Sequence, residues 1–123
     1  MKRANLQHVS VTQLVERFVA VTLAQDQALL MDEFSKFNRL FAEMEAIKRE
    51  LKSHDGDQRR ALIPLYDHPN AQVRLKAAKA TLAVSPESAR RMLQIIADSH
   101  EYPQAGEAGM SLDNLDRGIF KPT

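Results

Sequence analysis

The chain has 123 residues, of which 44% are hydrophobic and 27% are charged, with a formal net charge of +1. This length fits one domain that buries about two-thirds of its unfolded surface, and the composition is that of a folded protein rather than a disordered one. The chain has no cysteine, which excludes disulfides and thiolate chemistry. Its start lacks the apolar core of a signal peptide, and its apolar runs are far shorter than the roughly 20 residues of a membrane span. We therefore expect a cytoplasmic protein with no membrane partner.

Charge is unevenly distributed along the chain. Residues 57–97, here called the basic segment, carry a net charge of +4, whereas residues 98–123 carry −3 and residues 1–56 are neutral. Two interpretations are open. Either the acidic C-terminal part lies against the basic segment and offsets its charge, or the basic segment forms an exposed surface that binds anions.

Two long helices are predicted at the start of the chain. Ser10 followed by Gln13 forms a capping box, which begins a helix that runs to about Leu29. Neither glycine nor proline marks its end, but a single helix of more than about 40 residues is unusual for a domain of this size. We therefore predict a turn within residues 27–32. The second helix has one apolar face, made of Leu30, Phe34, Phe37, Phe41, Met44, Ile47 and Leu51.

The middle of the chain begins with a break at residues 55–57. Gly56 tolerates the left-handed conformation that ends a helix, and Asp57 is suited to cap the next one. Residues 60–66 predict a short third helix. Pro64 lies inside it, where it removes one backbone hydrogen bond and clashes with the preceding turn, so this helix should be irregular or bent.

Two further helices begin at a cap followed by a proline. Asp67 is predicted to cap a fourth helix with Pro69 in its first turn, where proline is tolerated. Ser85 is predicted to cap a fifth helix with Pro86 at its first position. The apolar side of the fifth helix consists of Met92, Leu93, Ile95 and Ile96.

The chain after Pro103 predicts a short sixth helix that ends near Gly118, because its apolar residues keep helical spacing. Gly106 and Gly109 lower helix propensity by roughly 1 kcal/mol each. Their spacing of three would also let this helix approach a neighbouring backbone closely. Residues 119–123 are predicted to form an extended tail.

These six helices predict an all-α fold. Short loops make successive helices antiparallel neighbours, which gives three hairpins at residues 10–54, 57–84 and 85–118 in a single domain. A four-helix bundle with two appended helices is the competing arrangement. The hairpin stack is favoured by Ala77, Ala78 and Ala80, because small side chains let the fourth helix contact neighbours on two sides.

The turn and fourth helix resemble a HEAT repeat. The stretch from Asp67 to Arg74 has an aspartate in the turn, a proline at the helix start and Val-Arg before a pair of alanines. The resemblance implies a short right-handed α-α superhelix, a HEAT-like solenoid of about six helices. It implies structural roles for Asp67, Pro69, Val73, Arg74 and Ala77. By this likeness Val73 packs inward, and the Arg74 guanidinium binds a carboxylate or a carbonyl of a nearby turn.

Over nearly its full length the chain is similar to a small bacterial family of HEAT-like proteins, the domain of unknown function two-thousand-and-nineteen. The similarity lies in Leu14-Val15-Glu16-Arg17-Phe18, Asn38-Arg39-Leu40, the middle repeat and the ending from Pro103-Gln104-Ala105-Gly106 to Phe120-Lys121-Pro122-Thr123. The resemblance implies a complete, stand-alone protein, and it brings no catalytic residue with it.

No pattern of reactive side chains predicts an enzyme. The histidines are His8, His54, His68 and His100, and none has the two-histidine spacing of a zinc protease helix. Glu50 and His54 are four residues apart, but two ligands make a poor metal site, so a surface pair at a helix end is the better interpretation. The sequence also has no glycine-rich phosphate loop and no nucleophile elbow. We expect no catalytic residue, metal or cofactor.

The predicted function is that of a non-enzymatic scaffold or adaptor. Stacked helical hairpins expose a concave face on which partners dock, and here that face would be polar and basic and would bind a protein. The candidate partner-binding residues are Arg39, Arg59, Arg60, Gln72, Lys76, Lys79, Arg90 and Arg91.

Three alternatives to this function stay open. The first is nucleic-acid binding through phosphate contacts of the basic segment, although the chain has no tryptophan and only two tyrosines for base stacking. The second is a small toxin-neutralising inhibitor, which a neighbouring toxin gene would indicate. The third is a homodimer that buries the two unstacked ends of the solenoid.

Overall fold

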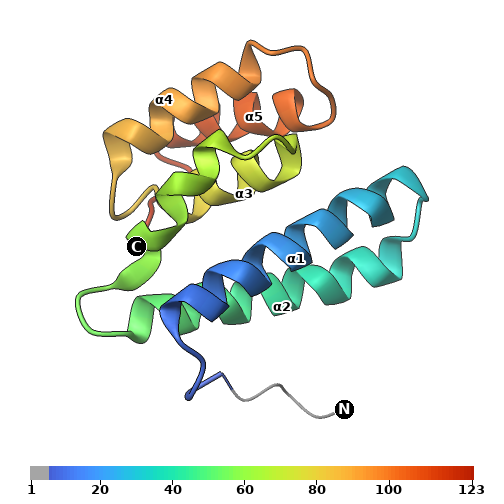
Figure 1. Ribbon diagram of the computed structural model, residues 1–123. Coiled ribbons are helices and arrows are strands. Elements are labelled where there is room, and N and C mark those ends of the chain that lie inside the picture. Colours follow the sequence, from blue (N-terminus) through green and yellow to red (C-terminus); the bar gives the residue numbers. More distant parts are fainter. Residues whose placement is uncertain (1–5) are drawn as a thin grey trace. The chain divides into compact units, whose positions relative to one another are not determined.

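A computed structural model describes residues 6–123 of the chain (Figure 1). These residues form five α-helices and one 3-10 helix and contain no strand, which confirms the prediction of an all-α protein with six helices. In chain order the helices are α1 (Val11–Leu30), α2 (Phe34–Ser53), η1 (Gln58–Asp67), α3 (Ala71–Ala80), α4 (Pro86–Ala97) and α5 (Gln104–Asp116). The basic start of the chain, Met1-Lys2-Arg3, lies outside the described residues.

The chain divides into two compact units, one that ends at Ala61 and one that begins at Leu62. Helices α1 and α2 contact each other in the first unit, and α3, α4 and α5 contact one another in the second. The single domain and the three-hairpin superhelix remain predictions.

The first unit begins with the predicted capping box. The Ser10 hydroxyl oxygen accepts a hydrogen bond from the Gln13 backbone N–H at 3.1 Å, and the Gln13 side chain accepts one from the Ser10 backbone N–H at 3.2 Å. The predicted turn is also present, because α1 ends at Leu30 and α2 begins at Phe34. Asp32 takes a left-handed φ of 54° there, in place of the glycine that usually ends a helix.

The buried face of α2 differs from the predicted one. The side chains that are buried are Leu40, Met44, Ile47 and Leu51, whereas Phe34 and Phe41 are exposed. Leu30, predicted on the same face, belongs to α1 and is also exposed. The reason is geometric: Leu40 and Phe41 are adjacent, so they lie about 100° apart around the helix, and only one of them can face the core.

The segment between the two long helices and α3 behaves as predicted. Gly56 has the left-handed φ that was predicted, 77°, but it lies in the turn beyond the helix, because α2 ends at Ser53 with an extended cap residue, His54. The ten residues of η1, Gln58–Asp67, form a continuous 3-10 helix with Pro64 inside it. This confirms the irregular helix that the proline predicted.

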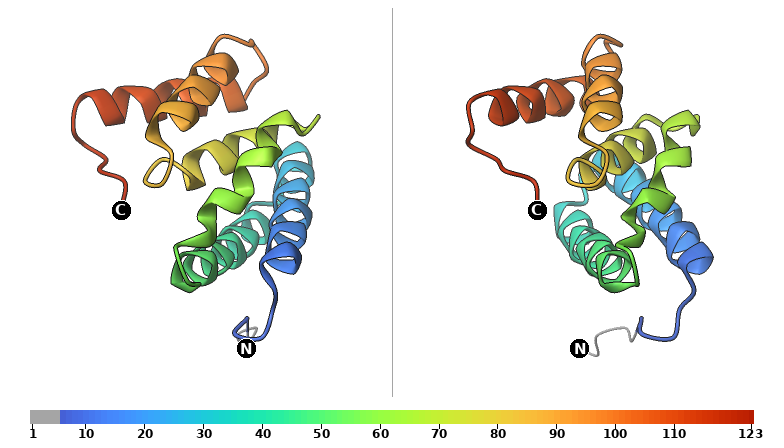
Figure 2. Two further views of the ribbon diagram at one scale, coloured as in Figure 1. Left: turned by 60° about the vertical axis from the view of Figure 1, so that its left-hand side comes forward. Right: turned by 90° about the vertical axis from the view of Figure 1, so that its left-hand side faces the viewer.

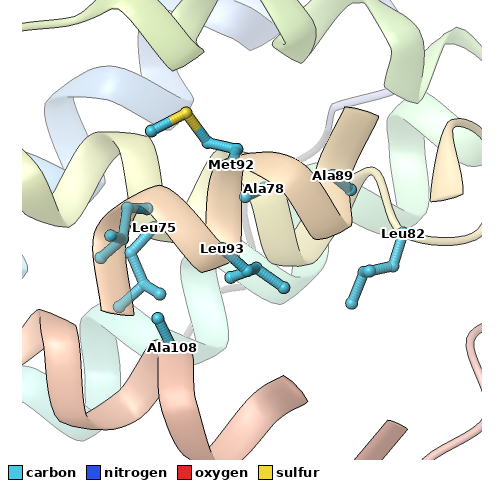
Figure 3. Packing of buried hydrophobic residues seen from close by; sticks show 8 residues of the cluster. Leu75, Ala78, Leu82, Ala89, Met92, Leu93 and Ala108 are labelled. Atoms are coloured by element: carbon cyan, nitrogen blue, oxygen red, sulfur yellow. The ribbon is translucent and has the colours of Figure 1, made fainter. Parts of the chain in front are cut away.

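The second unit has its own hydrophobic core (Figure 3). Its buried residues come from α3, α4, α5 and the turn after α3, namely Leu75, Ala78, Leu82, Ala89, Met92, Leu93, Ile96 and Ala108. Ile95 was predicted on this apolar side but is exposed, because α4 turns it about 100° away from its buried neighbour Ile96. The small residues that α5 buries are Ala105 and Ala108.

The predicted close approach at the glycines of α5 is wrong. A Cβ atom at Gly109 would meet no atom within 4 Å, and one at Gly106 would meet only the Tyr102 ring at 3.9 Å. Both glycines therefore lie away from the contacts that α5 makes. After α5 the chain continues as a tail without helix, residues 119–123, as predicted (Figure 2).

Candidate interaction surface

Helices α3 and α5 are joined by polar contacts, here called the α3–α5 seam. Gln72, Lys76 and Lys79 lie four and three residues apart, so they share one face of α3. The Gln104 amide donates a hydrogen bond to the Gln72 side-chain oxygen at 3.0 Å. The ammonium groups of Lys76 and Lys79 both donate to one carboxylate oxygen of Glu107, at 2.7 and 2.9 Å. The seam therefore consists of a buried amide pair and two lysines that share one carboxylate.

Glu107 is the electrostatic centre of this seam. Burial raises the pKa of its carboxyl, but the ammonium groups of Lys76 and Lys79 outweigh burial and bring the pKa below the usual range. The Lys76 side chain is only 5% exposed. A charge so far from solvent requires a paired partner, and Glu107 supplies it.

Arg74 ties the start of α3 to its surroundings, as the HEAT resemblance implied. One guanidinium nitrogen donates to the backbone oxygens of His68 and Pro69, at 2.9 and 3.0 Å. The other donates to the carboxylate of Glu101 at 2.9 Å. Val73 is fully buried on the same helix, which also agrees with the implied inward packing.

The cap of α3 differs from the predicted one. Asn70, not Asp67, is the cap, and its side-chain oxygen accepts hydrogen bonds from the backbone N–H groups of Gln72 and Val73 at 2.8 and 3.1 Å. Pro69 precedes the cap instead of lying in the first turn. Asp67 ends η1 and is exposed. The structural roles assigned to Asp67 and Pro69 as cap and first turn are therefore wrong, whereas Ala77 is fully buried, as a closely packed helix requires.

Most candidate partner-binding cations are held in ion pairs within the protein. Arg59 is buried, and its guanidinium makes two hydrogen bonds to the carboxylate of Asp57, at 2.9 and 2.6 Å. The same contact lowers the pKa of Asp57. Arg90 pairs with Asp116 at the end of α5. Together with the lysines of the seam, these contacts pair four of the seven candidate cations with carboxylates of the same chain.

The eight candidates therefore do not form one exposed basic face. Three of them, Arg59, Gln72 and Lys76, were expected at the surface but are buried, and their polar groups can be buried because Asp57, Gln104 and Glu107 form hydrogen bonds with them. Only Gln72, Lys76 and Lys79 are brought together. The exposed candidates are Arg39, on α2, together with Arg60 and Arg91.

Charge neutralisation is thus the interpretation that applies to the second unit. The acidic groups that meet the basic segment come from the C-terminal quarter of the chain: Glu101, Glu107 and Asp116. Sequence reasoning had placed these carboxylates near the segment only by charge balance. The partners of individual lysines and arginines became apparent from the packing of α5.

The surface feature that sequence reasoning missed is a group of apolar side chains in the turn between α1 and α2. Leu30, Met31 and Phe34 are 73%, 61% and 67% exposed. The signal was present in the sequence, since three large apolar residues lie within five positions at a predicted turn. Helical periodicity assigned two of them to the core, which the packing of α2 does not support.

An open pocket of about 400 Å³ lies in the first unit. Its lining is mostly polar and consists of Gln7, Val11, Glu50, Ser53, His54, Asp55 and Gln58. The expected Glu50–His54 pair is present, with 3.5 Å between the His54 Nε2 and a Glu50 oxygen. Residues 6–123 contain no group of three side chains suited to hold a metal ion. The pocket therefore offers one imidazole–carboxylate pair.

Within the described part of the chain, none of the helices combines the length and the apolar character needed to cross a bilayer. This finding agrees with the short apolar runs of the sequence.

Comparison with known proteins places the chain in one family. The crystal structure of the protein RPA1889 from Rhodopseudomonas palustris CGA009 is similar to this chain, with a TM-score of 0.96 and 53% sequence identity over 98% of this chain and all of that one. No curated protein matches. The sequence profile of the domain of unknown function DUF2019 matches residues 12–116. This protein therefore belongs to the DUF2019 family.

Proposed function

We propose that this protein is a non-enzymatic scaffold or adaptor that binds a protein partner. The observation that carries the proposal is the amount of apolar surface left in water: ten large hydrophobic side chains are at least 40% exposed. Single exposed apolar residues are ordinary, but groups of them mark protein interfaces. Protein interfaces are also enriched in phenylalanine, tyrosine and methionine, and all three types occur among these ten side chains.

We further propose that residues 57–84 are a HEAT-like hairpin within a short right-handed superhelix. The Arg74 hydrogen bonds to turn carbonyls and the buried residues Val73 and Ala77 support this proposal. The different cap at Asn70 and the 3-10 geometry of the first helix depart from the regular repeat. A helical repeat acts by shape, with a surface on which another protein docks.

The pairing of the basic segment argues against nucleic-acid binding. A protein binds nucleic-acid phosphates through lysine and arginine side chains, which displace the small counterions held by the nucleic acid. Five of the seven basic residues in the segment instead meet carboxylates of this chain: Arg59, Arg74, Lys76, Lys79 and Arg90. A protein partner therefore fits the surface better than a nucleic acid does.

Two measurements on the full-length protein test this proposal. Fluorescence anisotropy with a labelled DNA duplex should show negligible binding near physiological salt. Purification from the native cell followed by mass spectrometry should recover a protein whose association is lost when exposed apolar residues are replaced by serine, either in the pair Leu30→Ser with Phe34→Ser or in the pair Ile95→Ser with Met110→Ser. Duplex binding with micromolar affinity that falls steeply as salt rises would contradict the proposal.

A further inference from the structure

The turn before α3 includes a hydrogen bond to a histidine ring. The Nδ1 atom of His68 accepts this bond from the Asn70 backbone N–H at 3.0 Å. Asparagine and aspartate side chains often accept such a bond from the backbone two residues further on, in an Asx turn, and the His68 ring takes that part here. An imidazole nitrogen accepts a hydrogen bond only while it carries no proton. The bond is therefore present only while the ring is neutral.

The start of α3 depends on the same turn. Asn70 is the cap of α3, and its side-chain oxygen accepts hydrogen bonds from two backbone N–H groups of the first helical turn. The Arg74 guanidinium donates to the backbone oxygens of His68 and Pro69. The ring, the cap and the guanidinium therefore hold one short turn, residues 68–70. A change at the ring acts directly on the backbone of the cap residue.

The charged groups around His68 come from three elements. Asp67 precedes it at the end of η1 and is exposed. Arg74 contacts its backbone oxygen from α3, and Glu101, in the loop between α4 and α5, pairs with Arg74. Among the described residues, no carboxylate makes an ion pair with the His68 ring. The turn also lies at the positive end of the α3 dipole, so a protonated ring gains no ion pair in exchange for the bond it loses.

We propose that the turn before α3 is a pH-sensitive switch: protonation of His68 breaks the hydrogen bond from Asn70 and loosens the first turn of α3. Protonation converts Nδ1 from an acceptor into a donor, so two donors, the ring and the backbone N–H, then face each other. Histidine ordinarily changes charge between about pH 5 and 8, whereas the carboxyl of Glu107 takes up a proton only at lower pH. The switch therefore acts while the α3–α5 seam is still charged. It needs no partner, and so goes beyond the proposed function.

Hydrogen exchange of the full-length protein, measured by NMR at about pH 7.5 and about pH 5.5, tests the switch. Each exchange rate is divided into the intrinsic rate of the same amide at the same pH, which gives a protection factor. The reporters are the backbone amides of Asn70, Gln72 and Val73, whose hydrogen bonds form the turn and the cap. The amides of α2 are the internal reference, and circular dichroism checks at both pH values that the helices are retained.

Three variants separate the bond to the ring from other effects of pH. His68→Asn keeps an acceptor at this position, since asparagine forms an Asx turn and favours a turn before proline, but it does not titrate. His68→Leu removes the acceptor. His100→Asn is the matched control, because His100 is exposed in the loop after α4 and its left-handed φ of 62° is one that asparagine tolerates.

In the parent protein, the protection of the three reporters should fall by about three- to tenfold at the lower pH, as the loss of one hydrogen bond predicts. His68→Asn should keep the higher protection at both pH values, His68→Leu should show the lower protection at both, and His100→Asn should respond as the parent does. Any of four results would overturn the inference: equal protection of the parent at both pH values, a parent-like fall in His68→Asn, full protection in His68→Leu, or loss of the response in His100→Asn.

Discussion

The two compact units are stabilised in different ways. In the first unit α1 and α2 are each 20 residues long, and the ion pairs Glu45–Lys48 and Asp57–Arg59 join residues that are close in sequence. In the second unit α3, α4 and α5 are 10 to 13 residues long. Besides the local pair Asp113–Arg117, its ion pairs join residues that are 26 to 31 positions apart in sequence. Short helices bury less apolar surface against one another, so polar contacts between them matter more.

This comparison separates two uses of charge. In the first unit Arg39 is exposed at the surface, where ion pairs contribute little, and the buried Arg59 pairs only two positions away, with Asp57. Cations of the second unit hold α3 and α4 to α5 through Glu107 and Asp116. The basic segment of this protein therefore serves mainly to stabilise the contacts of α3 and α4 with α5.

The largest expected effect concerns apolar packing, which both units share. Leu93→Ala in α4 and Leu14→Ala in α1 each remove a fully buried side chain and should lower the free energy of unfolding by about 2–5 kcal/mol. Urea denaturation of the purified variants measures both values. A loss below about 1 kcal/mol for Leu14→Ala alone would show that packing is not what stabilises the first unit.

The next effect tests the seam of the second unit. Glu107→Gln leaves the ammonium groups of Lys76 and Lys79 without their carboxylate and should cost about 2–3 kcal/mol, which is below the value for a fully buried pair because Glu107 is half-exposed. Glu45→Gln in α2 is the matched control and should change stability by less than about 0.5 kcal/mol. Equal effects of the two changes would remove the difference between the units.

The same carboxylate predicts a dependence on pH. The folded-state pKa of Glu107 lies below the usual range, so its contribution to stability is complete above the unfolded-state pKa and is lost as pH falls through the folded-state value. The free energy of unfolding should therefore decline from about pH 5 downward. Glu107→Gln should make this decline shallower. An identical pH profile for parent and variant would mean that the two lysines do not stabilise this carboxylate.

A smaller effect is expected at the start of α3. Arg74→Ala removes the donor to two backbone oxygens and to Glu101 and should cost about 1–3 kcal/mol. Arg91→Ala, at an exposed position of α4, should change stability by less than about 0.5 kcal/mol. Hydrogen exchange of the α3 amides locates the effect. Unchanged exchange in Arg74→Ala would show that the turn is held by other contacts.

The smallest effect compares one helix cap from each unit. Ser10→Ala and Asn70→Ala each remove a side-chain oxygen that accepts backbone hydrogen bonds, and each should cost about 0.5–2 kcal/mol. Thermal denaturation of the two variants gives the comparison. Asp67→Ala should leave the stability nearly unchanged. A larger loss of stability in Asp67→Ala than in Asn70→Ala would show that Asp67 caps α3, as the sequence predicted.

Local signals in the sequence predicted the helices well. The capping box at Ser10, the left-handed Gly56, the irregular helix around Pro64 and the helix that begins at Pro86 are all present. Each depends on residues within one turn of one another, so tertiary packing has little power to change it. The Arg74 contact to the turn carbonyls was implied by the resemblance to a HEAT repeat, not by such a local signal.

Features that depend on distant residues were not predictable in the same way. Both Leu40 and Phe41 fit a helical apolar stripe, and the choice between them depends on how α2 packs. Lys76 has the character of a surface residue in the sequence, because its partner Glu107 lies 31 positions away. The prediction of the α3 cap was wrong for another reason. Asp67 and Asn70 are both residue types that cap helices well, and the geometry of the turn selects Asn70.

The single carboxylate shared by Lys76 and Lys79 restricts the order in which this region can change during evolution. Losing Glu107 first removes the carboxylate that both Lys76, which is buried, and Lys79 contact, whereas replacing Lys76 first by methionine leaves Lys79 to neutralise the glutamate. Lineages in this family that replace both positions should therefore pass through the lysine change before the glutamate change.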